Sequence, residues 1–145
     1  METIESCSFP NPRLSDTLGM DPRPTLEGGS SVLIVEDDED IRYLLAESLA
    51  TSGFKVTEAG DGVEAFAALE DGLEPDVIVL DLMMPRMNGW AFLEKLRTQA
   101  EHRDIPVLVT SAFSDLRSAK ANAYLAKPFR MDEFDEAVAR LCGLQ

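Results

Sequence analysis

Short runs that are apolar throughout alternate along this chain with segments whose apolar residues recur at helical spacing. Strands without polar alternation are buried on both faces, which is typical of a parallel sheet covered by helices. The strand patterns cover residues 32–35, 55–59, 77–80, 107–110 and 124–126, and the second is weaker than the first and third. This alternation predicts an α/β fold with one five-stranded parallel sheet.

The segments between the strands carry helical patterns. In the first of them Ile41, Leu44, Leu45 and Leu49 recur at helical spacing, and the last helix is expected to be capped by Asp132. Right-handed crossovers leave few strand orders, and the flavodoxin-like order 2-1-3-4-5 is the natural one for five strands. We therefore expect a doubly wound domain over residues 30–145, with helices on both faces of the sheet.

Residues 1–29 show no sustained apolar period and contain Phe9-Pro10-Asn11-Pro12, so they are predicted to be a flexible N-terminal tail. The formal net charge of −14 disfavours contact with nucleic-acid backbones and anionic membranes. No apolar run approaches the ~20 residues of a membrane helix. Glu2 and Glu5 stand where a secretory signal would carry basic residues. We therefore expect a cytoplasmic protein that binds neither nucleic acid nor membranes.

The residues at which the strands end carry the chemical information. The first strand ends at Glu36 and Asp37, the third at Asp81, the fourth at Ser111 and the fifth at Lys127. The carboxyl ends of parallel strands share one edge of the sheet, where ligands of doubly wound folds bind. We therefore expect three carboxylates, a hydroxyl and an ammonium group to converge on one pocket.

This grouping predicts a particular chemistry. Crowded carboxylates raise one another's pKa and favour a bound cation, and oxygen ligands without imidazole or thiolate select Mg²⁺. A carboxylate beside Mg²⁺ can attack a phosphoryl group and form an aspartyl phosphate. Lys127 and the metal would then offset the charge on the transferring oxygens.

These residues resemble the receiver domains of bacterial response regulators in two-component systems. The matching segments are residues 35–38, 79–85 followed by Asn88-Gly89, 106–112 and 124–129. Each segment alone is a weak signal, but four in the expected order, each on the expected strand end, are specific. The resemblance extends over everything after the tail.

The resemblance implies a role for each residue of the cluster. Asp81 matches the phosphoacceptor, Asp37 a direct Mg²⁺ ligand and Glu36 a ligand that acts through water. Met83, two residues past the acceptor, matches the position whose backbone carbonyl binds the metal.

The resemblance also assigns the residues that respond to phosphorylation. Ser111 matches the switch hydroxyl, Lys127 the ion-pair partner of the phosphoryl group, and Tyr124 the aromatic residue whose rotamer reports phosphorylation. Thr110 is the alternative switch hydroxyl. Counting from Pro106 favours Ser111, and so does the alternation of the strand, which points the two side chains to opposite faces. A cis peptide bond is implied between Lys127 and Pro128.

One segment departs from the family pattern. Only residues 112–123 separate Ser111 from Tyr124, and Lys120-Ala121 replaces the expected Gly-Ala turn. The fourth helix is therefore predicted to be short or irregular. The catalytic pocket is not touched by this deletion, whereas the output surface is.

Because nothing follows the last helix, the resemblance implies a stand-alone receiver. We expect it to accept a phosphoryl group on Asp81 from a histidine kinase or phosphotransfer protein, with Mg²⁺ as cofactor, and to signal through contacts with an unknown protein target. No enzymatic activity is expected beyond self-phosphorylation and autodephosphorylation.

Two alternatives remain open. A phosphatase of the haloacid dehalogenase type also forms an aspartyl phosphate, but it needs a second Asp where this chain has Met83. A receiver fold whose switching is lost or altered by the short fourth helix would be a plain binding module.

Overall fold

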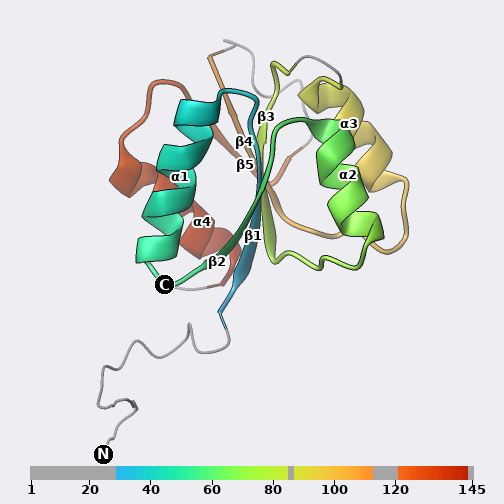
Figure 1. Cartoon of the computed structure of the whole chain (residues 1–145), viewed down its shortest axis with the longest axis horizontal. Coiled ribbons are helices and arrows are strands. Elements are labelled where there is room, and N and C mark those ends of the chain that lie inside the picture. Colours follow the sequence, from blue (N-terminus) through green and yellow to red (C-terminus); the bar gives the residue numbers. More distant parts are fainter. Residues whose placement is uncertain (1–28, 85–86, 113–120, 144–145) are drawn as a thin grey trace, which may run out of the picture.

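The computed structural model describes residues 29–84, 87–112 and 121–143 (Figure 1). Within them one parallel sheet has the strand order β2-β1-β3-β4-β5, which confirms the predicted doubly wound fold. The strands are β1 (Ser31–Val35), β2 (Lys55–Ala59), β3 (Val77–Asp81), β4 (Val107–Ser111) and β5 (Ala123–Ala126). The described helices are α1 (Glu39–Thr51), α2 (Gly62–Glu70), α3 (Gly89–Arg97) and α4 (Met131–Leu141).

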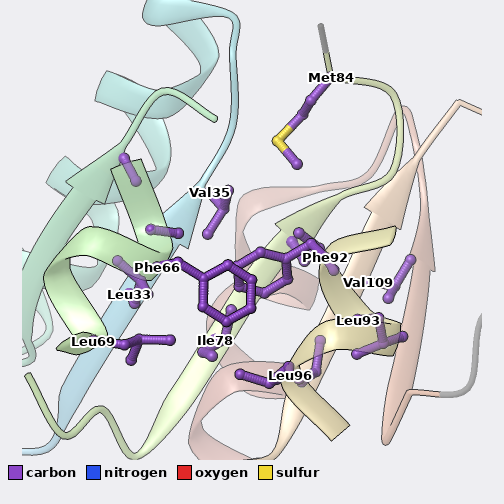
Figure 2. Close-up of a cluster of buried hydrophobic side chains, with 14 of the residues drawn as sticks. Leu33, Val35, Phe66, Leu69, Ile78, Met84, Phe92, Leu93, Leu96 and Val109 are labelled. Atoms are coloured by element: carbon purple, nitrogen blue, oxygen red, sulfur yellow. The ribbon is translucent and has the colours of Figure 1, made fainter. Parts of the chain in front are cut away.

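Helices α1 and α4 cover one face of the sheet, and α2 and α3 cover the other (Figure 1). Each face has its own core. Figure 2 shows the core under α2 and α3, where the rings of Phe66 and Phe92 lie 4.7 Å apart between their centroids. The opposite core packs Leu45 and Leu49 of α1 and Phe134 of α4 against the sheet. The central strands β1, β3 and β4 are therefore buried on both faces, as their unbroken apolar runs indicate.

The start of α1 accounts for most of the acidic run that follows β1. Asp38 is the N-cap, and its Oδ1 accepts hydrogen bonds from the N–H groups of Asp40 and Ile41 at 3.0 and 3.1 Å. Glu39 and Asp40 lie in the first turn, where negative charge complements the helix dipole. Glu36 and Asp37 precede the cap and stay outside the helix.

The expected cap of the last helix is wrong. The N-cap of α4 is Arg130, and Asp132 lies inside the first turn, where its carboxylate pairs with Arg130 Nε at 3.0 Å. The helix begins earlier because the carboxylate of Glu133 reaches back and accepts a hydrogen bond from the Arg130 N–H at 3.0 Å.

The apolar stripe of α1 is only partly buried. Leu45 and Leu49 are buried in the core, whereas Leu44 is 59% exposed, as is its neighbour Tyr43. At the start of α3, a Cβ on Gly89 would lie 2.5 Å from the Cα of Leu82, so this position requires glycine. The Asn88-Gly89 pair therefore serves close packing of α3 on the end of β3, with Asn88 as the N-cap.

Two further expectations concern the end of the sheet. The peptide bond between Lys127 and Pro128 is cis, as expected. The expected tail, apart from Gly29, lies outside the described residues, and so do residues 113–120 of the expected short fourth helix. None of the helices in the described part of the chain is both long enough and apolar enough to span a membrane.

Candidate functional site

Three carboxylates meet at the carboxyl edge of the sheet, which is the upper edge in Figure 1. Glu36 and Asp37 follow β1, and Asp81 ends β3, the strand paired with β1 in register. One carboxylate oxygen from each residue lies within 4.8 Å of the other two. Adjacent parallel strands thus bring together side chains that are more than 40 positions apart in sequence.

Glu36 is held at every polar group. Its N–H donates to the carbonyl oxygen of Ala59 at 3.1 Å, and its own carbonyl accepts from Arg42 Nη1 at 2.9 Å. Its Oε2 accepts from the N–H of Asp38 at 3.1 Å, and its Oε1 accepts from Lys127 Nζ at 2.9 Å. A carboxylate that is only 2% exposed needs such partners, so Glu36 is a fixed wall of the site.

Asp81 lies beside this wall and is 5% exposed. Its Oδ1 accepts a hydrogen bond from the Met83 N–H at 3.3 Å, and its Oδ2 is 3.7 Å from Lys127 Nζ. Burial, and then the charge of Glu36, raise the pKa of Asp81 to about 7, against the opposing effects of Lys127 and the Met83 N–H. The ionised form of Asp81 is therefore disfavoured, first by burial and then by the neighbouring charge of Glu36.

Lys127 spans the site from β5. Burial on its own would lower the pKa of Lys127, but the hydrogen bond to Glu36 and the charges of Asp81, Glu36 and Asp37 outweigh it and raise that pKa. The backbone N–H of Lys127 donates to the Ser111 carbonyl at 2.9 Å, which joins the ends of β4 and β5. Lys127 therefore stays charged and lies closer to Glu36 than to Asp81.

The remaining expected residues surround this cluster. Ser111 is fully buried at the end of β4, and Tyr124 of β5 packs against the core under α2 and α3. The Tyr124 hydroxyl accepts a hydrogen bond from the Ala121 N–H at 3.2 Å. The Met83 side chain is exposed, and a thioether is a poor ligand for Mg²⁺, so the group that Met83 could offer the site is its backbone carbonyl. Thr110 is 1% exposed, and its Oγ1 has no partner within the described residues.

The donor set fits a magnesium ion. It consists of carboxylate oxygens without imidazole or thiolate, and oxygen ligands of this kind favour Mg²⁺ over zinc or copper. The electrostatics fit as well, because a cation between the carboxylates would relieve the repulsion that raises the pKa of Asp81.

Sequence reasoning missed Arg42. This side chain is 18% exposed, bonds the Glu36 carbonyl, and pairs with Glu58 of β2 at 3.1 Å. One signal could have pointed to it: a lone arginine follows the acidic run 36–40, one helical turn after the cap. Side chains in helices lean toward the N-terminus, so this arginine reaches back to the acidic loop.

A family model for the response regulator receiver domain matches residues 32–139. The chain belongs to this family. Receiver domains are phosphorylation-accepting signalling modules rather than classical enzymes, and they are phosphorylated by histidine kinases. A Mg²⁺ site is typical of them.

Curated relatives of this receiver domain include transcriptional regulators and other response regulators. Over 108 residues the chain is 36% identical to the DNA-binding dual master transcriptional regulator RpaA of Synechocystis sp.. It is 38% identical over the same length to the response regulator MprA of Mycobacterium sp.. The match covers 70% of this chain but only 44% and 46% of those proteins, so the chain spans less than half of their length.

Solved receiver structures share this fold. The receiver domain of a signal transduction histidine kinase from Syntrophus aciditrophicus matches with a TM-score of 0.74 and 30% identity, over 79% of this chain and 91% of that one. The response regulator TrrA from Thermotoga maritima, solved in complex with Mg²⁺-BeF, matches with a TM-score of 0.69 and 31% identity. That match covers 77% of this chain and 98% of TrrA.

Proposed function

We propose that this receiver domain accepts a phosphoryl group on Asp81 from a histidine kinase or a histidine phosphotransfer protein. One observation carries the proposal: the Asp81 carboxylate lies among Glu36, Asp37 and Lys127 at the carboxyl edge of the sheet. This arrangement supplies a nucleophile, oxygen ligands for a cation and a fixed ammonium group within one site.

The residues that would hold Mg²⁺ are Asp37 and Asp81 directly, Glu36 through water, and Met83 through its carbonyl oxygen. A bound Mg²⁺ would supply charge neutralisation for the carboxylates and for the transferring phosphoryl oxygens. The buried, fully bonded Glu36 is suited to orient a water rather than to move toward an ion.

In the proposed transfer, a carboxylate oxygen of Asp81 forms a bond to phosphorus as the P–N bond of the donor phosphohistidine breaks. The imidazole leaves with the electron pair of that bond and takes up a proton. Asp81 must be ionised to attack, and Lys127 Nζ, 3.7 Å from its Oδ2, offsets the charge on the phosphoryl oxygens.

Three residues are proposed to respond to phosphorylation, namely Ser111, Lys127 and Tyr124. Ser111 and Lys127 share a backbone hydrogen bond, so a shift of either residue toward the phosphoryl group moves the adjoining ends of β4 and β5. The Tyr124 hydroxyl accepts a hydrogen bond from the Ala121 N–H, and a change of the Tyr124 rotamer would break this bond. The proposed output is therefore a change in protein contacts around the end of the sheet.

We propose that the protein donor docks on an apolar groove beside the site. The groove has a volume of about 430 Å³ and is lined by the exposed Leu44 of α1, by Met131 of α4 and by Phe129. Lys127 also lines it, so a helix bound there would place a histidine close to Asp81. Exposed apolar groups at a charged active site are typical of a protein-binding surface.

The test uses acetyl phosphate as a small phosphodonor. The wild-type chain should gain one phosphoryl group in the presence of Mg²⁺, measured by intact mass, and none in EDTA. Asp81→Asn should gain none under either condition, because the amide is not a nucleophile. Equal labelling of Asp81→Asn and the wild type would refute the assignment.

A further inference from the structure

Arg42 joins the acidic loop after β1 to strand β2. Its guanidinium donates from Nη1 to the carbonyl oxygen of Glu36 at 2.9 Å and from Nε to Glu58 Oε1 at 3.1 Å. The side chain is 18% exposed, whereas Glu58 is 43% exposed. A guanidinium buried to this extent needs partners for its N–H groups, and it takes one of them from the backbone of the acidic loop.

The carbonyl that Arg42 holds belongs to the peptide group between Glu36 and Asp37. Peptide groups are planar, so fixing this oxygen also fixes the direction in which the chain leaves toward the Cα of Asp37. The N–H of Glu36, which belongs to the preceding peptide group, and its carboxylate are hydrogen-bonded elsewhere. The bond from Arg42 therefore restricts the remaining rotation, which is about the Cα–C bond of Glu36. Asp37 is exposed, so the place of its carboxylate depends on this backbone rather than on packing.

We infer that Arg42 is a positioning residue for the divalent-cation site, and that it holds Asp37 in place through the Glu36 carbonyl. The inference rests on the proposed function, because it takes the carboxylates of Asp37 and Asp81 to bind Mg²⁺. Arg42 acts only through the peptide backbone, and Glu58 anchors its other side to β2.

The charge of Arg42 and its hydrogen bonds predict opposite changes in Mg²⁺ affinity when Arg42 is replaced. A positive charge beside a cation site repels the cation, so its removal would strengthen Mg²⁺ binding if repulsion were the main effect. Removal of a group that orients a metal ligand weakens metal binding instead, by about 10- to 100-fold at other sites. The direction of the change therefore separates a positioning role from a purely electrostatic one.

The test is a calorimetric titration of the full chain with MgCl₂ at constant ionic strength. Arg42→Met removes every donor that bonds Glu36 and Glu58 but keeps an unbranched apolar stem. Arg42→Gln removes the charge and shortens the side chain. Arg140→Gln removes the same charge from an exposed pair with Glu136 on α4. We expect about tenfold weaker Mg²⁺ binding in both Arg42 variants and a change of less than about twofold in the control.

Hydrogen exchange of the Asp38 amide in EDTA gives a readout that does not involve the metal. This N–H donates to Glu36 Oε2, so it should exchange faster in the Arg42 variants if the loop has lost its anchor. Folded Arg42 variants that bind Mg²⁺ as tightly as the wild type, or more tightly, would overturn the inference alone. A wild-type chain that binds no Mg²⁺ would instead refute the proposed cation site, and the inference with it.

Discussion

The carboxyl group of Asp81 is held in an environment that disfavours its charge. It is buried next to the ionisable Glu36, while Lys127 lies 2.9 Å from Glu36 but 3.7 Å from Asp81. Lys127 therefore neutralises the charge of Glu36 more than the charge of Asp81, the proposed nucleophile. This leaves Asp81 with a pKa of about 7 and with electrostatic repulsion that a cation or a phosphoryl transfer can relieve.

The raised pKa of Asp81 predicts that this residue lowers the free energy of unfolding at high pH. The folded chain binds more protons than the unfolded chain between pH 3.8, the ordinary pKa of this group, and about 7. The contribution of Asp81 to the free energy of unfolding therefore falls as the pH rises through this window and levels off above it. In EDTA, Asp81→Asn should gain stability over the wild type between pH 4 and pH 8, by on the order of 4 kcal/mol at most.

Urea unfolding of both proteins at the two pH values measures this difference. Saturating Mg²⁺ at pH 8 should narrow the gap, because the ion stabilises the wild type. A gap that is the same at pH 4 and pH 8 would mean that Asp81 titrates normally.

The hydroxyl of Thr110 predicts a stabilising substitution. This side chain is 1% exposed and its Oγ1 has no partner among the described residues. Thr110→Val keeps the shape and removes a buried polar group, so it should raise the free energy of unfolding by about 1 kcal/mol. Thr110→Ser keeps the hydroxyl, loses a methyl group and should be less stable than the wild type. A destabilised valine variant would show that the hydroxyl is bonded, for instance to a buried water.

The strands are the elements that sequence reasoning places best. Unbroken apolar runs predicted β1, β3 and β4 to within one residue, because burial on both faces leaves little choice of residue type. The meeting of Glu36, Asp37 and Asp81 followed from the shared edge of parallel strands.

Details that depend on side-chain reach or helix boundaries could not be predicted in this way. The closer contact of Lys127 with Glu36 depends on the length of two side chains that extend across intervening strands. The role of Arg42 depends on a backbone carbonyl, which no residue type records. The first residue of α4 was misplaced because the capping glutamate lies inside the helix rather than before it.

Helix α1 carries the prediction for the donor surface. Leu44 is 59% exposed in the groove beside Lys127. We therefore expect Leu44→Asp to lower the rate of phosphotransfer by about tenfold or more. The donor in this assay is a histidine phosphotransfer protein that phosphorylates the wild type. Labelling by acetyl phosphate should stay within about twofold, because that donor needs no docking surface.

The matched control is Val63→Asp on α2, a 44% exposed apolar residue on the opposite face of the sheet. It should leave both reactions unchanged. Equal loss of phosphotransfer in the two variants would show that added negative charge, and not the groove, is responsible.

The two cores lie on opposite faces of the sheet, and the candidate site occupies the carboxyl edge of the sheet between them (Figure 1). The chain spans less than half the length of RpaA and MprA, so its downstream contacts are proposals. That the target is a protein and not a nucleic acid stays a prediction from the net charge of −14. The short fourth helix stays a prediction, because residues 113–120 lie outside the described ranges.

Chemical trapping identifies the residue that receives the phosphoryl group, which we expect to be Asp81. Borohydride reduces an aspartyl phosphate to homoserine, so peptide mass mapping after reaction with acetyl phosphate and Mg²⁺ identifies the modified position. We expect homoserine at position 81 and a reduced side chain at no other acidic residue. Homoserine at position 37, 5-hydroxynorvaline (the corresponding alcohol of glutamate) at position 36, or a stable phosphate on a serine or threonine would mean that another residue is the acceptor.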